Sequence, residues 1–141
     1  MAIVHFYEKP GCLNNAKQKQ VLSAAGHLLI VHDLLNEPWA TDRARLRSFF
    51  GNLPVCEWFN RSAPAIKNGH IKPESLNERQ AIELMINDPL LIRRPLLEVD
   101  GRRQTGFDPQ TIEAWLGLSA DNLRNDLETC PKQHKQQACQ P

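Results

Sequence analysis

Cys12 is the residue in this chain whose type and position best suit covalent chemistry. It follows an apolar run at residues 2–7 and a short Glu-Lys-Pro-Gly segment, at the point where a helix should begin. The first backbone N–H groups of a helix have no internal partner, and with the helix dipole they stabilise a nearby anion. A thiolate, the nucleophilic form of cysteine, is therefore favoured here, and Lys9, Lys17 and Lys19 should favour it further.

The sequence also allows a plainer role for Cys12. Free cysteine is among the most buried residue types, and a lone cysteine after a strand is more often a small hydrophobic side chain than a nucleophile. Redox loops of this kind usually carry a second cysteine three residues later, but Asn15 stands at that position. No disulfide can close within this loop, so Cys12 must act as a single thiol or with a partner from elsewhere.

Two apolar runs and the segment between them predict a strand-helix-strand unit. The strands are expected at residues 2–7 and 28–32, and the helix at 15–25, where Gly26 provides a C-terminal stop. The second strand is apolar without alternation, as expected for a parallel strand covered on both faces. The unit should therefore form a parallel pair, with Cys12 just before its helix.

The rest of the chain predicts further helices and a hairpin. Helices are expected from residue 41 or 42 to 50 and, after a capping box formed by Ser75 and Glu78, up to Asn87. Beyond them we expect strands at 96–99 and 103–107 around an Asp100-Gly101 turn, and a last helix at 110–116.

This order of elements predicts an α/β fold of the thioredoxin-like type. A parallel β-α-β unit and a β-hairpin would share one mixed sheet, with a helical subdomain inserted at about 42–87. The length of 141 residues suits one domain with a sizeable core, which we place at 1–118. Asp, Asn, Gln and Lys dominate 119–141, so a flexible polar tail is expected there.

Composition limits the classes of partner and compartment. Seventeen Lys and Arg residues against sixteen Asp and Glu residues give a net charge of +1, which argues against a nucleic-acid partner. No apolar run is as long as a membrane span, and the N-terminal residues lack the pattern of a signal peptide, so we expect a cytoplasmic protein with no membrane partner. In a reducing compartment its four cysteines are expected to be thiols.

Arg94 is the second residue that could do chemistry. It precedes Pro95, and a residue before proline favours extended geometry, so Arg94 should project rather than continue a helix. Its planar guanidinium could bind an oxyanion through two parallel hydrogen bonds. An arginine before proline is more often a solvated helix exit, and Arg61 is a further candidate on weaker grounds.

The remaining cysteines give weaker signals. Cys130, His134 and Cys139 lie close together in the tail and are ligand types that zinc and iron use. They lack a fourth ligand and a fixed geometry, so surface thiols are favoured and no metal site is predicted. A mobile tail could also carry Cys130 or Cys139 to Cys12 as a resolving thiol. Cys56 is expected in the core.

Three groups of residues make the chain similar to the arsenate reductase and Spx family. They are Cys12 after Tyr7-x-x-Pro10, the loop with Asn60-Arg61, and the segment 89–95 followed by Gly106-Phe107. The resemblance covers about residues 2–118 and implies a thioredoxin-like fold with an inserted helical subdomain. It also implies Cys12 as catalytic nucleophile, Arg94 and Arg61 as oxyanion-binding residues, and a supporting cis peptide bond at Pro95.

In the glutathione- and glutaredoxin-dependent members of this family, one cysteine attacks arsenate and glutathione resolves the adduct. The resemblance thus implies a thiol oxidoreductase that holds no cofactor and takes glutathione or a glutaredoxin as external reductant. Segments 6–12, 57–61 and 98–103 most resemble the nitrogenase-associated (NifO-like) branch of the family.

Two departures from the family pattern support an alternative function. Gly106 stands near the position of the family's third arginine, and Asn14 and Asn15 replace the small hydroxyl-bearing residues after the cysteine. The alternative is a non-catalytic, Spx-like interaction or regulatory protein with a partner in nitrogen metabolism. Retained Cys12 and Arg94 favour the oxidoreductase.

Overall fold

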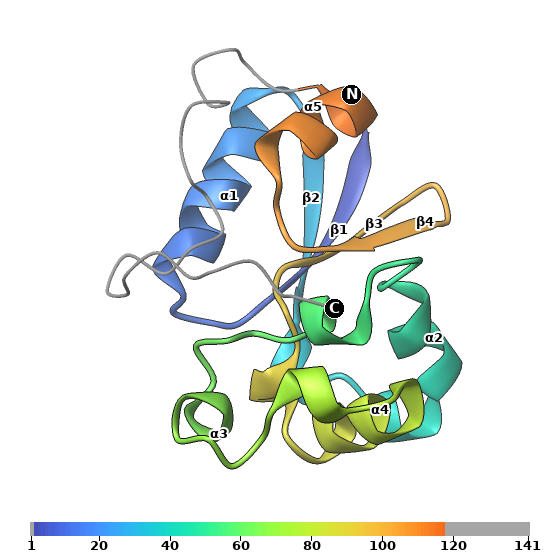
Figure 1. The fold of residues 1–141 in the computed structure, drawn as a ribbon. Coiled ribbons are helices and arrows are strands. Elements are labelled where there is room, and N and C mark those ends of the chain that lie inside the picture. Colours follow the sequence, from blue (N-terminus) through green and yellow to red (C-terminus); the bar gives the residue numbers. More distant parts are fainter. Residues whose placement is uncertain (1, 118–141) are drawn as a thin grey trace.

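The computed structural model describes residues 2–117, which form a mixed four-stranded sheet flanked by helices (Figure 1). The strands are β1 (Ile3–Glu8), β2 (Leu28–Asp33), β3 (Leu96–Val99) and β4 (Arg102–Thr105). Their order is β2-β1-β3-β4, with β1 parallel to β2 and antiparallel to β3, and β3 antiparallel to β4. The predicted α/β thioredoxin-like fold is confirmed. The predicted tail at 119–141 lies outside the described residues.

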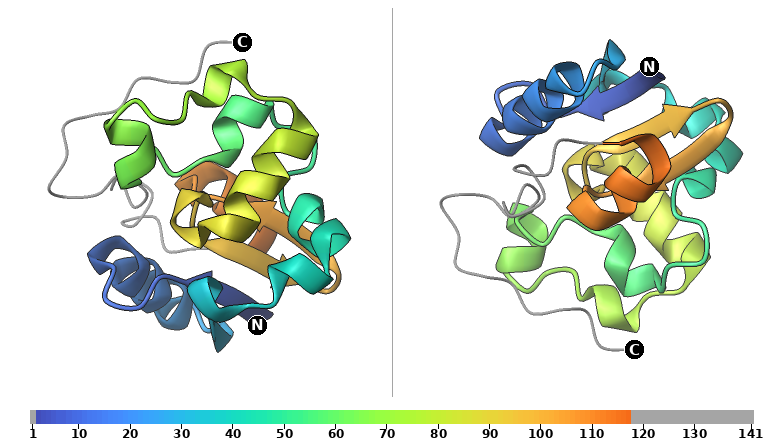
Figure 2. Two further views of the ribbon diagram at one scale, coloured as in Figure 1. Left: turned by 90° about the horizontal axis from the view of Figure 1, so that it is seen from below. Right: turned by 90° about the horizontal axis from the view of Figure 1, so that it is seen from above.

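Helices α1 (Leu13–Ala24) and α5 (Pro109–Leu116) pack on one face of the sheet (Figure 2). α1 begins two residues earlier than the sequence predicted, because Cys12 itself is the N-cap residue. The side chains buried between these helices and the sheet are Val4, Phe6, Val21, Leu22, Leu97, Val99, Phe107 and Ile112.

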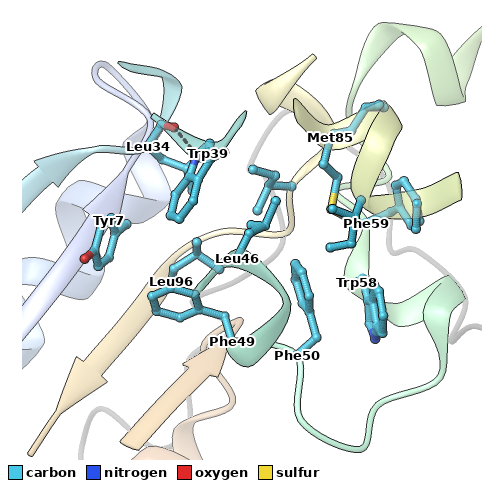
Figure 3. Close-up of a cluster of buried hydrophobic side chains, with 14 of the residues drawn as sticks. Tyr7, Leu34, Trp39, Leu46, Phe49, Phe50, Trp58, Phe59, Met85 and Leu96 are labelled. Atoms are coloured by element: carbon cyan, nitrogen blue, oxygen red, sulfur yellow. Dashed lines mark hydrogen bonds between the residues drawn. The ribbon is translucent and has the colours of Figure 1, made fainter. Parts of the chain in front are cut away.

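The segment between β2 and β3 contains α2 (Arg43–Ser48), α3 (Pro64–Lys67) and α4 (Glu78–Asn87), joined by short 3-10 turns. An aromatic core holds it together (Figure 3), in which Trp39 donates a hydrogen bond from Nε1 to the carbonyl of Leu34 at 3.0 Å. The helices of the predicted insertion therefore lie between β2 and β3. Within residues 2–117, no helix combines the length and the apolar character needed to cross a membrane.

The two central strands separate two cores. Phe6 and Leu97 lie opposite each other and join the cluster under α1 and α5. The next pair, Tyr7 and Leu96, joins the cluster of the inserted segment, because successive side chains of a strand point to opposite faces (Figure 3). Where β1 and β3 meet, the sheet is thus covered on both faces.

β2 differs from the sequence prediction of a strand covered on both faces. It forms an edge of the sheet, and its side chains Leu28, Ile30 and Val31 remain 52%, 40% and 46% exposed. The prediction was wrong because the inserted segment packs on the central strands, at Tyr7 and Leu96, rather than over β2.

The start of α4 also differs from the prediction. The capping box is formed by Asn77 and Gln80, each side chain accepting the other's backbone N–H, and not by Ser75 and Glu78. Ser75 lies in the preceding 3-10 turn, where its hydroxyl donates to the carbonyl of Lys72 at 2.8 Å.

Two leucines of α1 provide a test of this packing. Leu22 is fully buried under the sheet, whereas Leu13, beside Cys12, is 58% exposed. Leu22→Ala should lower the free energy of unfolding by about 2–5 kcal/mol, because it removes buried surface and leaves a cavity. Leu13→Ala should change it by no more than about 0.5 kcal/mol. Urea denaturation followed by circular dichroism measures both, and equal losses would contradict the packing.

Candidate functional site

A tight turn places Cys12 between β1 and α1. The Cys12 N–H donates to the carbonyl of Lys9 at 3.1 Å, and Gly11 has φ +82°. Proline at the second position and a left-handed glycine at the third are the pattern of a type II turn, so Pro10 and Gly11 specify this geometry locally. Cys12 is both the last residue of the turn and the N-cap of α1.

The environment of Cys12 favours its thiolate. Partial burial by itself raises the pKa of this thiol, but the backbone N–H groups of Asn15 and Asn14 and the guanidinium of Arg94 lower it, and the net pKa is lowered. The Cys12 side chain makes no standard cap hydrogen bond to α1, and the N–H groups at the start of the helix favour the thiolate through their dipoles. Cys12 is a free, partly exposed cysteine.

Arg94 approaches Cys12 from the start of β3. The Arg94-Pro95 bond is cis, as the resemblance implied, and Leu96 then pairs with Tyr7 of β1. The residue before β3 and the turn after β1 therefore meet at the same end of the sheet. The structure brings together two of the three residues that the sequence predicted for the site, Cys12 and Arg94.

Arg61 is held differently. Its backbone neighbour Asn60 donates to the carbonyl of Leu91 at 2.8 Å, which fixes this loop beside the segment that leads to Arg94. The Arg61 guanidinium binds the carboxylate of Glu74 and lowers the pKa of that carboxyl. Among the contacts described for residues 2–117, none joins Arg61 to Cys12. Its part in anion binding stays a prediction.

The surroundings of Gly106 leave no space for a side chain at the position near which the family has its third arginine. Its φ is +80°, and a Cβ placed there would lie 2.7 Å from Nε of Arg93. A side chain at this position would need an unfavourable left-handed backbone and would have to displace the Arg93 guanidinium. Arg93 also donates to the carbonyl of Glu57 at 3.2 Å.

The sequence singled out Asn15 only as the residue that replaces a second cysteine or a small hydroxyl-bearing residue, and it did not single out Gln18. Both are buried on the sheet-facing side of α1, next to Val21 and Leu22. The Asn15 side chain accepts the Lys9 N–H at 3.0 Å and donates to Oε1 of Gln18 at 2.8 Å. Their spacing of three residues is the only signal in the sequence, and it indicates a shared helix face without indicating burial.

The other cysteines fall into two groups. Cys56 is buried, as predicted, but it is disulfide-bonded, so the expectation of a free thiol is wrong for this residue. Cys130 and Cys139, with His134, lie outside the described residues. Within residues 2–117, no group of three or more His, Cys, Asp or Glu side chains is placed to hold a metal ion.

Comparison with known proteins gives a family match and one close relative. The ArsC family profile matches residues 7–115. An uncharacterised 15.7 kDa protein in the draG 3' region of Rhodospirillum rubrum is 46% identical over 139 residues, which cover 99% of this chain and 95% of that protein.

Solved structures share the fold. An arsenate reductase from Vibrio cholerae superposes with a TM-score of 0.66 at 22% identity, covering 82% of this chain and 98% of the other. An arsenate reductase-related protein from Brucella melitensis gives a TM-score of 0.59 at 26% identity, covering 84% of this chain and 97% of the other.

The electrostatics of the site predict the pH dependence of Cys12 alkylation. In the wild type, the alkylation rate should rise with a midpoint below the ordinary cysteine pKa, because the thiolate is the reacting form. Arg94→Ala should raise that midpoint by about one pH unit, since it removes a nearby positive charge. Arg61→Ala is the matched control and should leave the midpoint unchanged, because Glu74 holds that guanidinium.

Mass spectrometry of the Cys12 peptide after timed iodoacetamide treatment gives the midpoint. A wild-type midpoint at the ordinary value would show that the site does not stabilise the thiolate. Equal shifts in both variants would show that Arg61 also acts on the sulfur.

Proposed function

Because the chain belongs to the ArsC family, we propose that it is a thiol oxidoreductase whose Cys12 attacks an oxyanion such as arsenate. The observation that carries the proposal is the position of Cys12 at the N-terminus of α1 with the Arg94 guanidinium beside it, an arrangement that lowers the pKa of the thiol. A thiolate next to an arginine combines a nucleophile with a group that binds oxyanions.

The proposed reaction begins with attack of the Cys12 thiolate on the arsenic(V) atom. A sulfur-arsenic bond forms, and an arsenate oxygen leaves as water after protonation. Glutathione then attacks the Cys12 sulfur, so a disulfide forms between Cys12 and glutathione. The electron pair of the sulfur-arsenic bond goes to arsenic, which leaves as arsenite. A second thiol, from glutathione or a glutaredoxin, releases Cys12 and forms the final disulfide.

The sequence of the loop supports an external reductant. Asn15 stands three residues after Cys12, where a redox loop would need its second thiol. The two electrons for arsenate reduction therefore come from Cys12 and a thiol outside the loop, and the proposal needs no bound cofactor. Glutathione and glutaredoxin as the specific reductants are part of the proposal.

Binding of the oxyanion would require less rearrangement at Arg94 than at Arg61. Arg94 already lies beside the sulfur, so an arsenate oxygen there would complete its charge-assisted hydrogen bonds. Arg61 would first have to release the carboxylate of Glu74. We propose Arg94 as the main oxyanion-binding residue and Arg61 as a second one that an incoming anion recruits.

A second candidate function is an interaction or regulatory role in nitrogen metabolism, without turnover. Gly106, which leaves no space for a side chain beside Arg93, supports this alternative, since the site then has one arginine fewer than the family resemblance implies. The resemblance to the nitrogenase-associated branch suggests the class of partner.

Arsenate turnover distinguishes the two functions. The assay contains the protein, glutathione, glutaredoxin, glutathione reductase and NADPH, and it records arsenate-dependent NADPH oxidation. Cys12→Ser should abolish turnover. Arg94→Ala should lower kcat/KM by roughly 10- to 100-fold, the value of one hydrogen bond to a charged group.

Arg43→Ala is the control for Arg94→Ala, because Arg43 forms a surface ion pair with Glu83 and should not affect turnover. Absence of arsenate-dependent oxidation, together with a low-pKa Cys12, would exclude arsenate as the substrate. It would favour the interaction function.

A further inference from the structure

Asn15 and Gln18 form a buried polar pair where α1 meets the sheet. Their side chains are 1% and 0% exposed, respectively. Burying an amide is costly unless its polar atoms are hydrogen-bonded. Apolar side chains would fill this face of the helix without burying polar atoms, as Val21 and Leu22 do one turn later. Packing alone therefore does not explain why two amide side chains are buried on this face of α1.

The hydrogen bonds of Asn15 lead to the turn that carries Cys12. Oδ1 of Asn15 accepts the N–H of Lys9 at 3.0 Å, and Nδ2 donates to Oε1 of Gln18 at 2.8 Å. The carbonyl of the same Lys9 accepts the N–H of Cys12 at 3.1 Å. Both backbone polar groups of Lys9 are thus engaged, one by Asn15 and one by Cys12.

Asn15 acts on the turn from both ends. Its side chain holds Lys9, the first residue of the turn, while its backbone N–H faces the sulfur of Cys12, the last residue. Gln18 fixes the orientation of the Asn15 amide, because its Oε1 accepts from Nδ2 and leaves Oδ1 directed at Lys9.

We propose that Asn15 is a positioning residue that holds the turn at residues 9–12 against the first turn of α1, and so keeps the Cys12 sulfur over the helix N-terminus. The inference rests on the proposed function in that it assumes Cys12 to be the nucleophile. The amide takes the place of a second cysteine in the loop. It gives the loop a fixed geometry where a second thiol would give it a resolving partner.

The test compares Asn15→Ala with Val21→Ala, a substitution on the same buried face that does not touch the turn. Two quantities are measured: the Cys12 alkylation midpoint, and hydrogen exchange of the Lys9 amide by NMR. In Asn15→Ala, the Lys9 amide should exchange at least about 10-fold faster because it loses its acceptor. The Cys12 midpoint should rise by about one pH unit as the sulfur leaves the N–H groups.

Val21→Ala should change neither quantity, although it creates a cavity in the core. If Asn15→Ala frees the Lys9 amide but leaves the Cys12 midpoint unchanged, Asn15 is structural only and the proposal is wrong. Equal midpoint shifts in both variants would also overturn it, because general loosening of α1 would then be the cause.

Asn15→Asp is the second variant, in case Asn15→Ala does not fold. Its carboxylate still accepts the Lys9 N–H, and Gln18 can turn its amide to donate from Nε2 to the second carboxylate oxygen. The Lys9 amide should therefore stay protected, and loss of protection in a folded variant would overturn the proposal. The arsenate assay is independent of these readouts. A wild type with a low Cys12 midpoint that depends on Asn15, but with no turnover, would retain the positioning role and reject the proposed substrate.

Discussion

The antiparallel pairing of β1 with β3 is the interaction on which the candidate site depends. Tyr7 lies opposite Leu96, so the chain leaves β1 toward Cys12 at the end of the sheet where it enters β3 from Arg94. A slip of one residue in this register would turn the large side chains of β3 to the wrong faces. Burial on both faces of the central strands therefore fixes the position of the guanidinium relative to the thiol.

Within that frame, the charge of Cys12 depends on a balance of two opposing effects. Partial burial disfavours the thiolate, whereas the N–H groups of the first helical turn and Arg94 favour it, and the second effect is larger. The influence of a helix terminus falls off within one turn, so displacement of the sulfur from the start of α1 would weaken the stabilisation of the thiolate. We therefore expect the hydrogen bond from Lys9 to Asn15 to affect the chemistry through the position of the sulfur.

Local rules explain the parts of the site that the sequence predicts. A Pro-Gly pair specifies a turn, and proline disfavours helical geometry in the residue before it, so the turn before Cys12 and the non-helical backbone at Arg94 follow from residue types alone. The pairing of Arg61 with Glu74 and the buried position of Asn15 depend on which distant segments meet, and no local pattern encodes that. The exposure of β2 was missed for the same reason, since the cover on a strand depends on where the inserted helices pack.

In the proposed reaction, the electrostatics that would favour attack by Cys12 would also favour its release from a disulfide. A thiol of low pKa is a better leaving group in thiol-disulfide exchange, because the departing sulfur carries the negative charge. The N–H groups of α1 and Arg94 stabilise that charge whether it belongs to the attacking or to the departing sulfur. Since Asn15 supplies no thiol, release requires a second thiol from outside the loop. A partly exposed, low-pKa cysteine is therefore suited to form a transient mixed disulfide and to leave it quickly.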